Sequence, residues 1–513
     1  MSSDSPTPAA DTSLQKVITT RQFIFMALSS SIGAGVLLAT YSSLAVGGPG
    51  SILVSFTVVG FAVWITMCAL GELSAAFPVT GSFYEYSVRF ISPAWGFSMG
   101  WNYVMNFLLI VAFELVVMIL CVQYWLPDML PEHILPAFIA GLILVNAFGA
   151  KWYAEMENFF ALCKMLVLTS FVIVAIVILR KVVPSDSRSA DELGIHIWER
   201  GAFKNGPAGF LYVFMAAGMA YGGTEMLGLM AAECKSPEKV MPLACKIVPI
   251  RIVWLYLLPI LMVGFVLDVP LEPGVISGGV SPFVAAMDQA GLHIVGTIFN
   301  SIIILAIFSM ASASVFASSR ALQAISARGM GPAIFAKVKW GHPIWALVLV
   351  YIFSLLSFIK AAQNGDRIFE WLLALAAGSN YFTWISICVC HIRLRLAIRN
   401  QGLNKEDILK WKSPVGVVGS VLAIVVFLFG LAAQIVAAVQ SPLPEPPHIL
   451  SSMLGIIIVV VFWAGYTLVK RDTYWIPLGQ INLQPKEEWT ARLGGNNDIE
   501  SAGAEMVESS NEQ

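Results

Sequence analysis

The sequence predicts an all-α polytopic membrane protein with about 12 transmembrane helices. Of its 513 residues, 58% are hydrophobic and only 12% are charged, whereas a soluble domain carries about 25% charged residues. Apolar stretches of the roughly 20 residues needed to cross a bilayer recur along the chain. Clusters of small residues interrupt two of these stretches at their centres, which is typical of a membrane protein with an internal binding site.

The apolar stretches define the expected helices in chain order. The third and the eighth are long enough that we expect them to be tilted in the bilayer. The expected spans cover residues 22–46, 51–76, 95–125, 134–150, 157–179, 208–230, 248–269, 296–324, 342–360, 370–392, 414–439 and 448–469.

Positive charge predicts the orientation of these spans. If the amino terminus is cytosolic, most of the 30 lysine and arginine residues fall in cytosolic segments. Because membrane proteins concentrate positive charge on that side, both termini are expected in the cytosol. We therefore expect a disordered cytosolic tail at residues 1–20, one membrane domain at residues 21–472 and a cytosolic tail at residues 473–513.

Several other classes of protein are not expected. No nucleophile–base pair, metal-ligand cluster or phosphate-binding loop stands out, so the sequence predicts neither an enzyme nor a bound metal or cofactor. No basic stripe indicates a nucleic-acid partner. The expected partners are the lipid bilayer and a small molecule, and no pattern predicts an oligomeric state.

The two interruptions indicate transport. The first span contains Ser29-Ser30-Ser31-Ile32-Gly33-Ala34-Gly35, and the sixth contains Gly218-Met219-Ala220-Tyr221-Gly222-Gly223-Thr224-Glu225. Glycine weakens a helix and frees backbone groups that lipid cannot satisfy. Two broken helices at matching positions in the two halves of a chain predict a transporter site near the bilayer midplane.

Several long motifs resemble those of one family. They are Ser31-Ile32-Gly33-Ala34-Gly35-Val36 in the first span, the run from Gly71-Glu72-Leu73 to Gly81-Ser82-Phe83 after the second, Gly223-Thr224-Glu225 with Ala231-Ala232-Glu233 in the sixth, and Ser318-Ser319-Arg320 in the eighth. Over about residues 20–480 the chain resembles amino acid permeases of the amino acid–polyamine–organocation superfamily, with the yeast and fungal group most similar.

The resemblance implies a 5+5 inverted repeat in which spans 1 and 6 are broken and spans 11 and 12 are peripheral. It also implies secondary active transport coupled to protons. The chain departs from the family pattern in the first span, where Ser29-Ser30 replace a glycine pair and Ala34 and Leu37 replace threonine and phenylalanine. Met219 stands where the sixth span commonly has an aromatic residue. These departures lie in the expected pocket wall, so the substrate stays open.

The broken helices provide groups that suit an amino acid. We assign Ala34 and Gly35, with Ser31 nearby, to the substrate carboxylate, because the start of a half-helix offers unpaired N–H groups and a positive dipole end. The substrate ammonium is assigned to backbone carbonyls. The candidates for it are Ile32, Met219, Ala220 and Gly222. The alternative is that the glycines only permit close helix packing.

Two further residues of the sixth span are candidates. Tyr221 either caps the substrate as a gate or packs as an ordinary aromatic side chain. Glu225 lies one helical turn further along the same face. Because a carboxylate inside a span is costly, we expect it either to anchor the break in span 1 by hydrogen bonds or to bind a cationic substrate.

Lys164 is expected to be the only basic residue well inside a span. It matches the lysine of the family's fifth span, where an ammonium can replace the sodium ion of sodium-coupled relatives. We expect Lys164 to be the proton-coupling group, and the alternative is a fixed cation bonded to carbonyls of span 1. Glu114, in the middle of span 3, is expected to face the pocket or to pair with a polar group.

These observations predict an importer of amino acids that uses proton symport and alternating access at the plasma membrane. One alternative is a narrower organocation carrier for polyamine, choline or γ-aminobutyrate. Another is a permease-like nutrient receptor, although the short tails argue against it. No sorting signal decides between the plasma membrane and the vacuolar membrane.

Overall fold

The computed structural model describes the chain in segments. They are residues 17–79, 81–180, 193–269, 281–339, 341–361, 365–439, 449–471 and 474–483. Every named element in these segments is a helix, and the pairing between extended residues is limited to two isolated β-bridges there. The predicted all-α class is therefore confirmed, while residues 1–16 and 484–513 of the two expected tails lie outside the described residues.

The described residues of the first half of the chain form seven named helices. They are α1 (Thr20–Ser29), α2 (Ala34–Leu37), α3 (Ala39–Ala76), α4 (Ser82–Phe90), α5 (Pro93–Gln123), α6 (Pro131–Ala147) and α7 (Ala150–Leu179). A short helix, α8 (Ile195–Gly201), precedes the second half.

The remaining helices of the described chain follow α8. They are α9 (Gly206–Ala220), α10 (Met226–Ala232), α11 (Pro237–Arg251), the π-helical η2 (Ile252–Leu257), α12 (Leu258–Val266), α13 (Pro282–Gln289), α14 (His293–Ala327), α15 (Ala333–Ala336), α16 (Ile344–Ser354), η3 (Leu355–Ala361), α17 (Gly365–Asn400), α18 (Lys405–Ile408), α19 (Gly416–Val439), α20 (Ile449–Lys470) and η4 (Leu478–Gln480).

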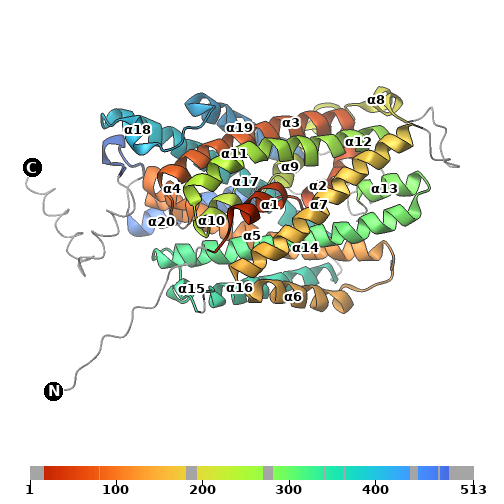
Figure 1. Cartoon of the computed structure of the whole chain (residues 1–513), viewed down its shortest axis with the longest axis horizontal. Helices are drawn as coiled ribbons and strands as arrows, with labels where there is room; N and C mark the ends of the chain where they lie inside the picture. The colour runs from red at the N-terminus through yellow and green to blue at the C-terminus, as the bar shows by residue number, and fades with distance from the viewer. Residues whose placement is uncertain are drawn as a thin grey trace, which may run out of the picture.

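These elements account for 12 spans. Eight helices of the described chain are long and apolar enough to cross a membrane, and three shorter apolar helices correspond to spans 4, 6 and 9. The remaining span is the first, which α1, α2 and the start of α3 form together. Most of the long helices run along one common direction, with α15 and α18 at one end and α8 and α13 at the other (Figure 1).

The boundary between spans 1 and 2 is a kink rather than a loop. α3 continues from Ala39 to Ala76, but Gly48 inside it has φ +79° and is followed by Pro49. A side chain at Gly48 would also meet the Gly201 carbonyl oxygen at 2.6 Å. Glycine is needed here because L-residues rarely adopt a positive φ and because the backbones approach so closely.

Two spans begin earlier than the hydropathy of the sequence predicts. α7 begins at Ala150 instead of residue 157, and α11 begins at Pro237 instead of residue 248. The first turns of both helices contain charged residues, so a search for apolar stretches misses where the helices begin. The correction matters because the prediction puts Glu157 and Arg251 at or near the first residues of their spans, whereas both lie well inside helical segments. The fully buried Arg251 makes the expectation that Lys164 is the only basic residue well inside a span wrong.

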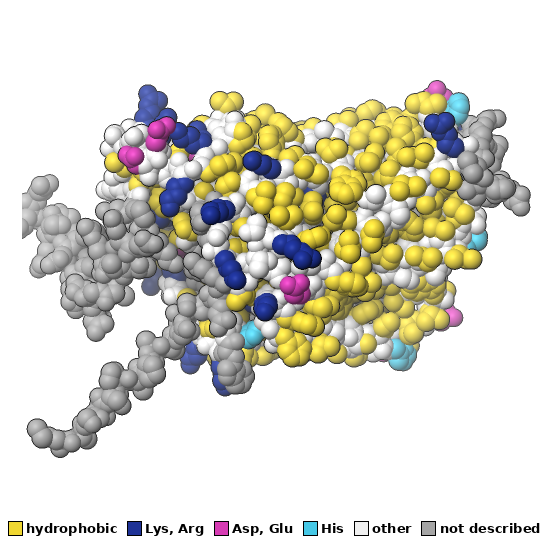
Figure 2. Space-filling model, in the orientation of Figure 1, with side chains coloured by type: hydrophobic (Ala, Val, Ile, Leu, Met, Phe, Trp, Pro, Cys, Tyr) yellow, Lys and Arg dark blue, Asp and Glu magenta, His cyan; other side chains and the backbone are white. Residues whose placement is uncertain are grey.

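The surface supports a membrane-spanning body. Hydrophobic side chains cover most of the face seen in Figure 2, and most lysine and arginine side chains of that face lie toward the end that carries α15 and α18. We call this end the basic end. Part of the expected carboxy-terminal tail packs there, since the Gln401 side chain donates to the Leu478 and Ile481 carbonyls at 3.0 and 2.8 Å.

Candidate functional site

Both predicted helix breaks are present. α1 ends at Ser29 and α2 begins at Ala34, with Gly33 in an extended conformation before it. In the sixth span α9 ends at Ala220 and α10 begins at Met226, and Gly223 between them has φ +91°. The unwound segments therefore coincide with the small-residue clusters of the sequence.

The two breaks touch each other. A Cβ atom on Gly35 would lie 2.7 Å from the Ala220 Cα atom, which leaves no room for a side chain. The hydroxyl of Tyr256, in η2, donates to the Ser31 carbonyl at 2.9 Å and lies 3.3 Å from the Ala220 carbonyl oxygen. It also lies 2.8 Å from the Ser31 hydroxyl. Tyr256 thus links the broken first span to the broken sixth span.

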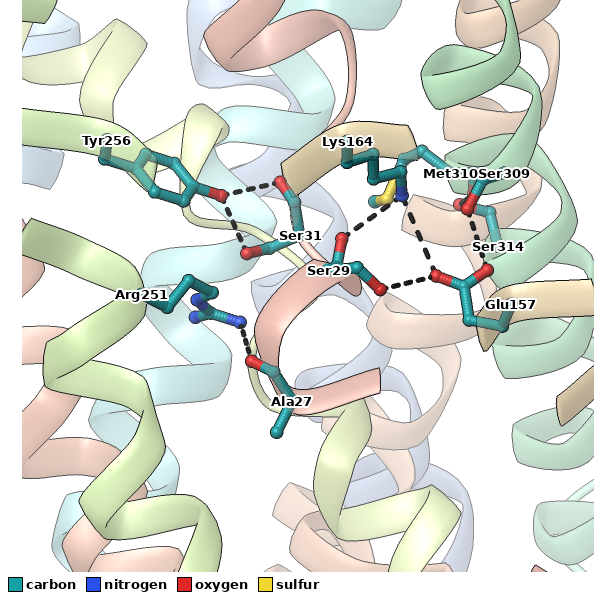
Figure 3. Close-up of polar contacts among 10 residues, drawn as sticks. All are labelled: Ala27, Ser29, Ser31, Glu157, Lys164, Arg251, Tyr256, Ser309, Met310 and Ser314. Carbon is teal, nitrogen blue, oxygen red and sulfur yellow. Dashed lines mark hydrogen bonds and ion pairs between the residues drawn. The ribbon is translucent and has the colours of Figure 1, made fainter. Parts of the chain in front are cut away.

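Donors from two other helices cap the end of α1 (Figure 3). Lys164 Nζ donates to the Ser29 carbonyl at 3.2 Å, and Arg251 Nη1 donates to the Ala27 carbonyl at 3.0 Å. The last carbonyls of a helix lack intrahelical partners and carry the negative end of its dipole. The two cations therefore provide hydrogen bonds to carbonyls at the end of α1 and neutralise the negative end of its dipole.

Lys164 has an acidic partner that the sequence reading did not identify. Glu157 Oε1 lies 3.7 Å from Lys164 Nζ, and both side chains are fully buried. The Ser29 hydroxyl donates to the same carboxylate at 2.8 Å, and the Ser309 hydroxyl on α14 donates to it at 2.7 Å. The spacing of seven residues, which puts both charges on one helix face, is the signal that could have revealed Glu157.

Glu114 lies on the predicted anion site of the first span. The Ala34 N–H, at the start of α2, donates to both Glu114 carboxylate oxygens at 3.3 and 3.2 Å. A Cβ atom on Gly33 would also meet Glu114 Oε1 at 2.7 Å. In this structure the position assigned to the substrate carboxylate is therefore filled by a carboxylate of the protein itself.

Glu225 anchors its own helix break. Its carboxylate accepts from the Gly223 N–H at 3.2 Å and from Trp384 Nε1, on α17, at 2.9 Å. These contacts fix the start of α10 to α17. In the described residues, the carboxylate that bonds the break of span 1 is that of Glu114 and not that of Glu225. The sixth span is tied to the first by Arg251, whose Nη2 donates to the Thr224 hydroxyl at 2.7 Å.

Tyr221 is packed against neighbouring helices. Its ring stacks on Tyr256 with centroids 4.6 Å apart, and its hydroxyl donates to the Phe56 carbonyl at 3.0 Å. The other residues assigned to the ammonium lie along the breaks. Ile32, Ala220 and Gly222 are buried and Met219 is partly exposed; a Cβ on Gly222 would meet Asn380 on α17.

Comparisons with known proteins identify the family. The amino acid permease family matches residues 22–474. The chain belongs to the amino acid permease family. This confirms the resemblance and the expectation that the chain is not an enzyme, and it makes the chain a multi-pass membrane protein of amino acid transport.

Individual relatives support the same assignment. The chain is 34% identical to amino-acid permease GAP5 of Candida albicans, over 91% of this chain and 76% of that protein. It is 35% identical to amino-acid permease inda1 of Hypocrea atroviridis, over 90% and 82%. It is 33% identical to cationic amino acid transporter 1 of Schizosaccharomyces pombe, over 90% and 80%.

A solved structure supports the fold. The crystal structure of MhsT in complex with L-phenylalanine matches with a TM-score of 0.57 and 15% identity. The match covers 82% of this chain and 100% of that chain. The two chains therefore share a fold.

Proposed function

We propose that this amino acid permease imports amino acids across the plasma membrane by proton symport and alternating access. The single observation that carries the proposal is the contact between Lys164 and the end of α1, where the ammonium reaches the Ser29 carbonyl at 3.2 Å. A titratable cation at this point can tie the state of a proton to the position of a broken helix that lines the site.

We propose that the substrate bridges the two breaks. Its carboxylate binds the N–H groups of Ala34 and Gly35, with the Ser31 hydroxyl nearby, and displaces the Glu114 carboxylate that accepts from Ala34. Its ammonium binds the carbonyls of Ile32, Met219, Ala220 and Gly222, where half-helix ends are negative. Tyr221 packs beside this site, and the position of its ring supports a role as part of the pocket wall.

The position of Glu114 favours a substrate with a carboxylate. Polyamines and choline have none and would leave the Ala34 N–H without an acceptor once Glu114 moved. Glu225 already accepts from Gly223 and Trp384, so it offers little to a cationic side chain. These contacts support amino acids, and leave γ-aminobutyrate, which has a carboxylate, as the organocation alternative.

The basic end supports the proposed orientation. Lysine and arginine side chains gather toward α15 and α18 on the face shown in Figure 2, and positive charge favours the cytosolic side. We therefore place both termini in the cytosol and the α8 and α13 end outside.

Uptake measurements test the proposed function. The chain is expressed in yeast that lacks its own amino acid permeases, and a panel of labelled amino acids is offered at acidic pH with and without a protonophore. Accumulation that the protonophore abolishes is the expected result, and it also defines the substrate range. No uptake of any amino acid by protein located at the cell surface would contradict the proposal and favour the organocation carrier or the receptor.

A further inference from the structure

We propose that Glu157 is the second member of the coupling site, a positioning residue that keeps Lys164 charged and links its charge to α1 and α14. This inference rests on the proposed function, because it concerns how the proton of symport is held. It adds to that function a residue that acts on transport only through Lys164.

The geometry joins three helices at one carboxylate (Figure 3). Glu157 and Lys164 lie on α7, Ser29 is the last residue of α1, and Ser309 lies in the middle of α14. Glu157 Oε1 receives the Ser29 hydroxyl at 2.8 Å and Oε2 receives the Ser309 hydroxyl at 2.7 Å. Ser29 contacts both members of the pair, since its carbonyl accepts from Lys164.

Burial makes the carboxylate necessary for the ammonium. Lys164 is 0% exposed and Glu157 is 1% exposed, and a buried charge without a counter-charge is strongly disfavoured. The other ionisable groups around the pair are Glu114 on α5, Arg251 on α11, Tyr153 on α7 and Tyr256 on η2. Glu114 accepts from Ala34 and Arg251 donates to Ala27 and Thr224. Glu157 is therefore the carboxylate that pairs with Lys164.

The proton cycle follows from this pairing. A proton from the outer solution binds the Lys164 amine, and the resulting ammonium and the Glu157 carboxylate together carry no net charge. Release of the same proton to the inner solution breaks one N–H bond and leaves a neutral amine beside a carboxylate. The Ser29 carbonyl then loses its charged donor, while the two serine hydroxyls still hold Glu157. One proton crosses per cycle, and α1 is held less firmly after its release.

Variants of Glu157 separate coupling from folding. Glu157→Gln keeps the size of the side chain and can still accept from a serine hydroxyl, but it removes the counter-charge. Glu157→Asp keeps the charge. The matched control is Glu155→Gln, because Glu155 lies on the same helix, is exposed and bonds the Gln22 side chain at 2.7 Å outside the cluster.

Two assays on the full-length protein read the effect. Counterflow of a labelled amino acid measures exchange without a proton gradient, and protonophore-sensitive accumulation over a range of external pH measures coupling. Glu157→Gln should keep exchange and lose accumulation by on the order of tenfold, which corresponds to about 1.4 kcal/mol of lost stabilisation of the charged state. Glu157→Asp should regain pH-dependent accumulation, and Glu155→Gln should match the wild type.

The outcomes distinguish the inference from the function on which it rests. Glu157→Gln with wild-type accumulation and pH profile, or with exchange and accumulation reduced in parallel at every pH, would overturn the role of Glu157 while the function stands. A wild-type protein that exchanges amino acids without any pH dependence would overturn proton coupling and this inference together. Wild-type protein without exchange would overturn the proposed function itself.

Discussion

Three side chains donate to carbonyls at the end of α1 and in the break that follows it. Lys164, Arg251 and Tyr256 come from helices far away in the sequence, and each reaches a different carbonyl of α1 or of the segment after it. A buried carbonyl without a partner costs about 1–3 kcal/mol. The break is therefore stable because the surrounding helices provide the hydrogen bonds that an intact helix would make.

Tyr256→Phe tests this contribution. The variant removes the hydroxyl that bonds Ser31 and reaches Ala220, so we expect the free energy of unfolding to fall by about 1–3 kcal/mol and transport to fall with it. Thermal unfolding in detergent and uptake measure the two effects. The control is Tyr86→Phe, which removes a buried hydroxyl that donates to the carbonyl of Phe77, the residue after α3, at 2.7 Å. Equal loss of uptake in both variants would contradict a special role for Tyr256.

Lys164→Gln tests the coupling role of the lysine. Because glutamine cannot carry the proton but can donate to the Ser29 carbonyl, we expect exchange of labelled amino acid to persist and its dependence on external pH to disappear. Counterflow and protonophore-sensitive uptake are the measurements. Full proton-driven accumulation by this variant would show instead that Lys164 is a fixed structural cation.

The broken helices work as pairs because their backbones meet. α2 and α9 approach at Gly35 and Ala220, where a Cβ atom would lie 2.7 Å from Cα and 3.2 Å from the backbone nitrogen of Ala220. Backbone atoms cannot move aside as the end of a flexible side chain can. The small residues that weaken each half-helix are therefore the same residues that let the two halves form one site.

Gly35→Ala should force these half-helices apart. Overpacking a tight contact costs about 1–3 kcal/mol, and here the displaced atoms belong to the proposed substrate site, so we expect uptake to be lost while protein still reaches the membrane. Gly465→Ala on α20 is the matched control, since a Cβ there meets nothing within 4 Å. Normal uptake by Gly35→Ala would contradict the close approach.

Buried contacts join α10, α14 and the segment before α1 toward the basic end. Arg320 Nε, on α14, donates to Glu233 Oε1 at 3.1 Å at the end of α10, and both side chains are buried. The segment before α1 is hydrogen-bonded to the residues that follow α10. The Ile18 N–H donates to the Glu233 carbonyl at 3.0 Å, and the Lys235 N–H donates to the Ile18 carbonyl at 3.2 Å. Under the proposed alternating access, opening toward this side requires these contacts to separate.

Arg320→Ala should make this end open more often. Removing one partner of a buried ion pair leaves the other charge unpaired and costs about 3–5 kcal/mol. Cys234, which is 0% exposed beside Glu233, then reports the opening: in a protein whose other cysteines are replaced by serine, a membrane-permeant thiol reagent should label it faster.

The labelling experiment has a matched control. Lys412→Ala breaks the exposed ion pair between Lys412 and Glu406, whose separation is 3.2 Å, and such surface pairs contribute about 0–1 kcal/mol. Labelling of Cys234 should not change in this variant. An unchanged labelling rate in Arg320→Ala would mean that the Glu233–Arg320 contact does not hold the end closed.

The helical class, the spans and both breaks could be predicted because, in lipid, each depends on residues that are close together in the sequence. A span must be apolar along its own length, and a break must contain small residues where it unwinds. Ser31, Ala34, Gly35 and Ala220 belong to those breaks, and they lie together in the structure. Lys164 was identified for the same reason, since a charge inside an apolar run is visible in the sequence.

The partners of these residues depend on how distant helices pack. Lys164 and Ser29 are 135 positions apart, Glu157 and Ser29 are 128 apart, and Arg251 and Ala27 are 224 apart. No local pattern specifies such pairs, which is why the contacts of Glu157 with Ser29 and of Arg251 with Ala27 were missed. For the same reason Trp384 was not expected as the partner of Glu225, for which an anchor on span 1 and a site for a cationic substrate were the two expected roles. The sequence determines where the helices run and where they break, and the rotation and contact of packed helices decide which buried charges meet.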